Sequence, residues 1–151
     1  MEIERKFLVK QLPDNLSAYP FLSIEQAYLC TEPVIRIRRQ NSEFILTYKS
    51  KGFLSREEYN LPLDEFAYNH LKTKADGIII TKKRYLIPTS DNLTIELDIF
   101  EGTHQGLQLA EVEFPNETTA KAFTPPLWFG EDVTYSPTFQ NNTLSQTTPN
   151  K

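Results

Sequence analysis

The dominant feature of this sequence is an alternation of polar and apolar residues with a period of two. It runs through residues 2–9, 24–30, 34–40, 43–50, 55–63, 78–88, 93–100 and 107–115. Successive side chains of a β-strand point to opposite faces, so this period predicts about eight strands. Most of the connections are short turn signals such as Lys51-Gly52, which favour hairpins and therefore antiparallel neighbours.

Two stretches have helical spacing instead. In residues 64–75, Phe66, Leu71 and Tyr68 fall on one side of the expected helix, and in residues 116–123 Asn116 is a suitable N-cap. A weaker third helix is expected near the C-terminus. We therefore expect residues 1–151 to form a single domain of the mainly β (α+β) class, a closed eight-stranded antiparallel barrel with a few flanking helices. The polar residues 136–151 are expected to be partly mobile.

Composition excludes several classes of function. The net charge is -4 and the pI is near 5.2, so the chain has no overall attraction for nucleic acid or for an anionic membrane. No apolar run approaches the roughly 20 residues of a membrane span, and the first residues are too acidic for a signal peptide, so we expect a cytoplasmic protein. Cys30 is alone, which excludes an intrachain disulfide and a cysteine-rich zinc site. His70 and His104 are expected on a helix surface and in a turn, without catalytic roles.

The polar face of most strands is charged, and the two signs are segregated by strand. The acidic pairs are Glu2/Glu4, Glu96/Asp98 and Glu111/Glu113, and the basic pairs are Arg36/Arg38 and Lys82/Arg84. Residues two apart on a strand lie about 6.5 to 7 Å apart, so each pair repels itself unless opposite charge is near. Clustered carboxylates suit a hard cation such as Mg²⁺ or Mn²⁺, and clustered Arg and Lys suit phosphate oxygens.

Two arrangements of this charged face are possible. An antiparallel sheet with one solvated face produces the same alternation without any function. Alternatively, eight strands close into a barrel whose interior holds side chains or one small ligand, and the charged face is then the inside. That face has seven acids, including Glu58, and seven bases, including Lys6, Lys49 and Arg56, so its charges are balanced.

The run Glu2-Ile3-Glu4-Arg5-Lys6 resembles the N-terminal ExExK signature of the CYTH domain, the triphosphate tunnel metalloenzyme superfamily. The similarity continues in order through residues 35–38, 46–50, 54–59, 81–85, 95–98, 109–114 and 125–134. This resemblance implies an eight-stranded antiparallel tunnel with flanking helices. It also implies an enzyme that acts on a triphosphate with a divalent metal, Mg²⁺ or Mn²⁺, as its cofactor.

The resemblance also implies a role for each charged residue. The implied metal ligands are Glu2, Glu4, Glu111 and Glu113. The implied catalytic acids, which bind a second metal or orient water, are Glu58, Glu96 and Asp98. The implied phosphate-binding residues are Lys6, Arg36, Arg38, Lys49, Arg56, Lys82 and Arg84. The expected partner is therefore a small-molecule triphosphate, without nucleic acid or membrane, bound by a monomer or homodimer.

The leading functional hypothesis is hydrolysis of inorganic tripolyphosphate to pyrophosphate and phosphate. The alternatives are a thiamine- or nucleoside-triphosphatase, an adenylate cyclase of the same fold, and a non-catalytic module that binds polyphosphate or a nucleotide. The last is motivated by residues 135–144, which contain no Lys or Arg where short bacterial members have several bases. Asn60 likewise stands where those relatives usually have an acid.

Overall fold

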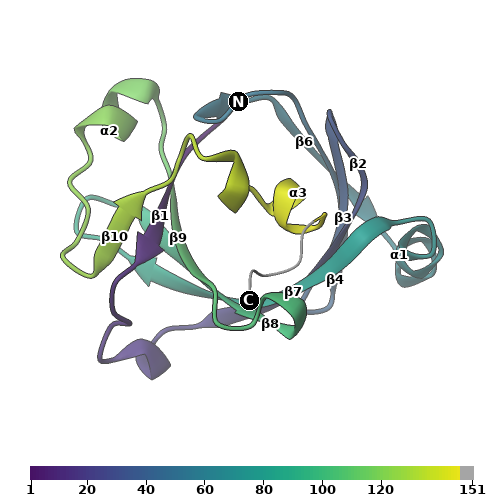
Figure 1. Cartoon of the computed structure of the whole chain (residues 1–151), viewed down its shortest axis with the longest axis horizontal. Coiled ribbons are helices and arrows are strands. Elements are labelled where there is room, and N and C mark those ends of the chain that lie inside the picture. The colour runs from purple at the N-terminus through teal and green to yellow at the C-terminus, as the bar shows by residue number, and fades with distance from the viewer. Residues whose placement is uncertain (147–151) are drawn as a thin grey trace.

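The computed structural model describes residues 1–146, without the side chain of Asn142, and its strands form a ring seen end-on in Figure 1. The strands are β1 (Glu2–Val9), β2 (Phe21–Thr31), β3 (Val34–Gln40), β4 (Glu43–Lys49), β5 (Ser55–Arg56), β6 (Glu58–Leu63), β7 (Asp76–Pro88), β8 (Thr94–Glu101), β9 (Gln108–Glu113) and β10 (Phe129–Asp132). The helices are α1 (Glu65–Lys72), α2 (Glu117–Ala122) and α3 (Asn141–Leu144). None of the helices in residues 1–146 is long and apolar enough to cross a membrane.

The ring closes through β5 and β6. Hydrogen bonds join the strands in the order β10-β1-β9-β8-β7-β2-β3-β4-β6, and β5 pairs with β1. Only Glu57 separates β5 from β6, so the two are halves of the single strand expected at residues 55–63. The predicted eight-stranded antiparallel barrel is therefore confirmed. The short β10 was not predicted; it pairs with the C-terminal half of β1, while β5 pairs with the N-terminal end.

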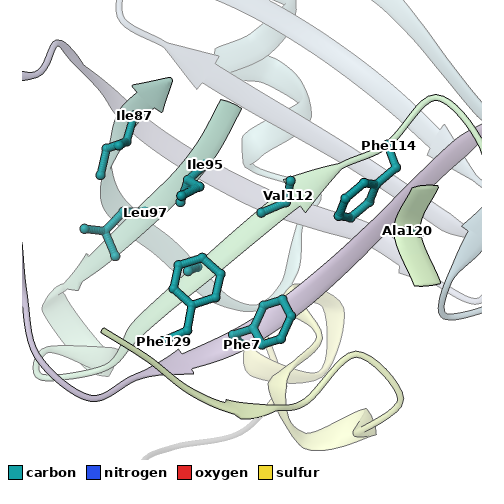
Figure 2. Packing of buried hydrophobic residues seen from close by; sticks show 9 residues of the cluster. Phe7, Ile87, Ile95, Leu97, Val112, Phe114, Ala120 and Phe129 are labelled. Atoms are coloured by element: carbon teal, nitrogen blue, oxygen red, sulfur yellow. The ribbon is translucent and has the colours of Figure 1, made fainter. Parts of the chain in front are cut away.

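One group of apolar side chains, on β1, β8 and β9, lies on the outer face of the wall. Figure 2 shows Phe7 of β1, Leu97 of β8 and Val112 of β9 packed together, with Ala120 of α2 and Phe129 of β10 beside them. Each of these residues is at most 4% exposed. Because side chains alternate along a strand, burying this outer face under α2 and β10 leaves the charged residues on the inner face.

The two expected helices form where their caps predicted. Asp64 accepts a hydrogen bond from Ala67 N (2.7 Å) at the start of α1, and Asn116 accepts one from Thr119 N (2.8 Å) at the start of α2. Tyr68 is buried against the wall, but Phe66 is 82% exposed, so the expectation that both pack on one side was wrong. Two helical positions are separated by about 200° around the axis, so the burial of Tyr68 turns Phe66 outward.

The residues after β10 return to the ring and lie across its opening (Figure 1). A 3₁₀ turn at Pro137–Phe139 leads into α3, which corresponds to the weak C-terminal helix expected from the sequence. Leu144 is 5% exposed and packs in a second cluster of buried residues with Tyr28 and Phe100. The expected mobility of the tail falls partly on residues 147–151, which lie outside the described residues.

Candidate functional site

A cavity of about 250 Å³ lies inside the barrel, and we call it the charged cavity. Twelve of the fourteen predicted site residues line it. They are Glu2, Glu4, Lys6, Arg36, Arg38, Lys49, Arg56, Glu58, Arg84, Glu96, Glu111 and Glu113. The strict alternation on β1, β3, β6 and β9 brings these side chains together from strands far apart in the sequence.

An acidic cluster lies on one wall of the charged cavity. Carboxylate oxygens of Glu2, Glu58 and Glu113 lie within 4.8 Å of one another, a spacing that a single cation could bridge. The cluster differs from the predicted ligand set, because Glu58 of β6 joins it while Glu4 and Glu111 remain outside it. The cause is the closure of the ring, which pairs β1 with β5 and places the adjoining β6 next to Glu2.

Basic side chains only partly compensate the acidic cluster. The Lys49 ammonium lies 3.0 Å from both carboxylate oxygens of Glu2 and 3.5 Å from Glu58 Oε2. Burial opposes ionisation of Glu2, but Lys49 and then Arg56 outweigh it and hold the pKa of Glu2 below its usual value. Within residues 1–146 no ion pair involves Glu113, and burial, followed by the charges of Glu2 and Glu58, raises its pKa. The negative charge of the acidic cluster is therefore only partly neutralised by the chain.

The neighbouring acids Glu4 and Glu111 have opposite electrostatic environments. Burial, and then the charge of Glu111, raises the pKa of Glu4 to about 8. Glu111 lies 3.5 Å from the Lys6 ammonium and 3.6 Å from the Arg84 guanidinium. These two cations outweigh the effect of burial and hold the pKa of Glu111 well below its usual value. Glu4 is thus the buried acid of this wall that most needs an added cation in order to ionise.

Two guanidinium groups on β3 have no acidic partner in residues 1–146. Arg36 donates to Thr47 Oγ1 (3.2 Å), and Arg38 donates from Nε to Gln26 Oε1 (2.9 Å). Arg36 is 6% and Arg38 9% exposed, and the described chain offers neither an ion pair. Burial, followed by the charge of Arg36, lowers the pKa of Arg38 to about 9. Two buried, unneutralised guanidiniums facing a cavity form a favourable site for an anion with several oxygens.

Lys82 and Asp98, the other two predicted site residues, do not line the charged cavity. Both are fully buried, and the Lys82 ammonium donates to Asp98 Oδ2 at 2.7 Å. Arg84 donates to both oxygens of Asp98, at 2.8 and 3.0 Å, so the carboxylate is fully engaged. The register of β7 and β8 places Arg84 opposite Asp98 and makes this contact direct. The structure thus gives Asp98 a position behind Arg84 rather than in the open space.

Most of the chain matches a known domain family. A model of the CYTH domain matches residues 1–135 of the chain. The chain belongs to the CYTH domain family. Its relatives include an inorganic triphosphatase of Nitrosomonas europaea, which is 41% identical over 152 residues that cover 98% of this chain and 99% of the relative. An inorganic triphosphatase of Acetivibrio thermocellus is 29% identical over 154 residues, with 95% and 92% coverage.

Two solved structures have a fold similar to the observed barrel. The crystal structure of the inorganic triphosphatase NE1496 superposes with a TM-score of 0.74 at 37% identity, covering 99% of this chain and 97% of that one. A protein from Hippeastrum, described as a putative adenylyl cyclase with a dominant triphosphatase activity, has a TM-score of 0.63 at 17% identity, with 81% and 83% coverage. At that identity the second likeness shows the fold alone.

Several residues that line the charged cavity or contact its side chains were not predicted as site residues. Tyr28 lines the cavity and Gln26 is the partner of Arg38; their alternation with Ala27 on β2 was a usable signal. Gln140 and Asn141 also line it, but they belong to a segment without strand periodicity, so no pattern indicated them.

The two histidines lie outside the lining of the charged cavity. His70 is exposed on α1, whereas His104 is buried and its Nε2 lies 2.7 Å from the Leu144 carbonyl oxygen.

Proposed function

We propose that this CYTH protein hydrolyses inorganic tripolyphosphate to pyrophosphate and phosphate with a divalent metal, Mg²⁺ or Mn²⁺. One observation carries the proposal: a closed barrel holds an acidic cluster and two unneutralised guanidiniums in the same cavity. Only a ligand that includes both a cation and an anion of several charges satisfies both walls. The similarity of this chain to two inorganic triphosphatases over nearly its full length supports the same substrate.

The acidic cluster fits a hard divalent cation. All its donors are carboxylate oxygens, and the raised pKa of Glu113 marks a position where positive charge is lacking. Glu2, Glu58 and Glu113 would hold the metal, and Glu4 and Glu111, the other predicted ligands, would add to its negative surroundings. When bound, the metal would offset the charge of the phosphates and lower the pKa of a coordinated water.

The basic side chains that line the charged cavity would position the substrate. Arg36 and Arg38 would bind oxygens of the phosphates, because their guanidiniums face the cavity without an acidic partner in the described chain. Four further cations already form ion pairs with carboxylates in the cavity: Lys6, Lys49, Arg56 and Arg84. When a triphosphate binds, these cations would also form ion pairs with its phosphates. Such fixed positive charges stabilise the charge that develops on the transferred phosphoryl group and on the leaving pyrophosphate.

The remaining predicted residues would act around this centre. Glu96 lines the cavity, lies 3.4 Å from Arg84, and has a pKa that burial raises, so in its ionised form it would be a stronger base towards water than an ordinary carboxylate. We propose that Asp98 and Lys82 instead support the site from behind. Asp98 accepts hydrogen bonds from Nε and Nη2 of Arg84 and thereby fixes the direction in which that guanidinium points.

The size of the charged cavity favours an inorganic substrate. Its volume of about 250 Å³ is below the usual range of small-molecule pockets, about 300 to 1,000 Å³. A chain of three phosphates is compact, whereas a nucleotide adds a sugar and a base. We therefore rank tripolyphosphate above nucleoside and thiamine triphosphates.

The test is a phosphate-release assay on tripolyphosphate, ATP and thiamine triphosphate with Mg²⁺ or Mn²⁺. We expect the fastest release from tripolyphosphate, and a loss of turnover in Glu113→Gln but not in Glu131→Gln, a matched change at an exposed position on β10. Faster release from a nucleotide would overturn the substrate. Tight binding of tripolyphosphate without turnover under either metal would instead identify a binding module, a reading that the uncharged Gln140 and Asn141 in the cavity favour.

A further inference from the structure

The C-terminal segment, residues 137–146, lies between two cavities of the barrel. One is the charged cavity, and the other, which we call the outer cavity, has a volume of about 340 Å³. The outer cavity is bounded by the turn after β2, the loop after β4 and the C-terminal segment itself, through Pro137, Gln140 and Thr143. Val34, Arg56 and Gln140 line both cavities, so the two meet at this segment.

Inside the barrel, contacts to the C-terminal segment come from lysines of the wall. The Lys6 ammonium donates to the Phe139 carbonyl oxygen at 3.0 Å, and the Lys82 ammonium reaches Asn141 Oδ1 at 3.4 Å. Gln140 Nε2 donates back to the Thr134 carbonyl oxygen at 3.3 Å. These contacts place Gln140 and Asn141 against the charged cavity, but the Lys6 ammonium also lines that cavity, where a bound phosphate would attract it.

The far end of the segment is attached away from the charged cavity, at β7 and the Gly102–His104 turn. The Leu144 carbonyl oxygen accepts a hydrogen bond from His104 Nε2 at 2.7 Å, and the Ser145 carbonyl oxygen accepts one from Ile78 N at 2.5 Å. His104 is 6% exposed, and its ring meets Phe100 edge-on at 6.5 Å between centroids. Gly77 has φ of +73°, and any Cβ there would overlap the Ser145 carbonyl oxygen.

We propose that His104 is a positioning residue that sets the size of the accepted triphosphate by holding the C-terminal segment between the two cavities. With the segment held, the charged cavity takes an inorganic triphosphate, and the outer cavity stays closed to any organic group attached to it. With the segment released, the cavities merge and a nucleoside triphosphate fits. The inference rests on the proposed function for its substrate, but the attachment by His104 is independent of it.

The test of specificity compares His104→Ala with two other variants. In His104→Gln the amide N–H still donates to the Leu144 carbonyl oxygen, and in His70→Ala the other histidine, exposed on α1, is removed. We measure kcat and KM for tripolyphosphate and for ATP with Mn²⁺. Loss of one buried hydrogen bond should lower the preference for tripolyphosphate about tenfold, mainly through KM, in His104→Ala alone. An unchanged ratio, or the same fall in His104→Gln, overturns the specificity role.

A second measurement follows the segment itself and needs no catalysis. Thermolysin cleaves before large apolar residues, and Phe139 and Leu144 are such sites in the segment. Mass spectrometry of the folded proteins should show faster cleavage there in His104→Ala than in wild type or His104→Gln. Equal cleavage overturns the attachment, even if the wild type hydrolyses no triphosphate. If His104→Ala lacks a cooperative thermal transition, Gly77→Ala, whose Cβ would overlap the Ser145 carbonyl oxygen next to Leu144, replaces it with the same expected results.

Discussion

Replacing Glu4 by Gln should stabilise the metal-free protein at neutral pH while lowering its activity. Glu4 is 7% exposed, and burial together with the Glu111 charge raises its pKa from the ordinary 4.5 to about 8. The folded state therefore binds the Glu4 proton more tightly than the unfolded state does. Wherever the folded state holds more protons, stability falls as the pH rises, so this group weakens the fold progressively between pH 4.5 and about 8.

The size of the effect follows from the shift. Each pH unit between the two pKa values contributes about 1.4 kcal/mol, so at pH 7 the unfavourable contribution of Glu4 has a ceiling of about 3.4 kcal/mol. Gln has the same shape without the charge, but its buried amide also needs partners, which reduces the gain. We expect Glu4→Gln to raise the free energy of unfolding at pH 7 by about 2 kcal/mol, which corresponds to about 4 to 8 °C in Tm.

The assay is thermal unfolding by circular dichroism in EDTA at pH 5, 6, 7 and 8, with Glu131→Gln as the control for loss of one surface charge. The advantage of Glu4→Gln over wild type should be small at pH 5 and should grow towards pH 8. A difference that stays constant with pH, or a variant that melts below wild type throughout, would refute the electrostatic reasoning. Growth of the same size in Glu131→Gln would show that net charge, and not the site, is responsible.

Three further predictions address metal binding, substrate binding and stability. Saturating Mn²⁺ should raise the Tm of wild type, as any ligand of the folded state does, and should raise it much less in Glu113→Gln; an equal rise, measured by differential scanning fluorimetry, would place the metal elsewhere. Arg38→Ala should weaken binding of tripolyphosphate about 10- to 100-fold in calorimetry, because charge-assisted bonds to phosphate are lost; Arg39→Ala, the adjacent position on the opposite face, should change it little. Arg5→Ala removes hydrogen bonds to Ala120 O (2.9 Å) and Asp132 (2.9 Å), so the urea midpoint should fall by an amount equivalent to about 2 kcal/mol while kcat stays unchanged.

The barrel and its charged interior could be predicted because charged residues recur at every second position on several strands, among them β1, β3, β8 and β9. Glu2, Glu4 and Lys6 occupy alternate positions of β1, and the structure places all three on the charged cavity. β10 was missed because Phe129–Asp132 has only four residues and no alternation. It forms through long-range packing of Phe129 on Phe7, with ring centroids 4.9 Å apart, which no local pattern reveals.

The two-residue period does not show how deep a side chain lies within the barrel or which residues each acid pairs with. Alternation assigns Asp98 to the inner face but does not show that Lys82 and Arg84 fill the space in front of it. Similarly, Glu58 and Glu2 come together only because the ring closes through β5, a tertiary event. The C-terminal segment gave only a weak helical signal, and its position was not predictable, since Leu144 is buried by residues from β2, β3 and β8 rather than by its own helix.

Lys49 gives the acidic cluster a counter-charge that belongs to the chain itself. Its ammonium lies between Glu2 and Glu58, at 3.0 and 3.5 Å. We therefore expect the barrel to assemble in the absence of metal, with loading as a later exchange in which a divalent cation displaces an ammonium. A displaced Lys49 remains beside the cavity, where it becomes available to phosphate oxygens. A bound divalent cation would thus leave the Lys49 ammonium free to contact the phosphate oxygens of the substrate.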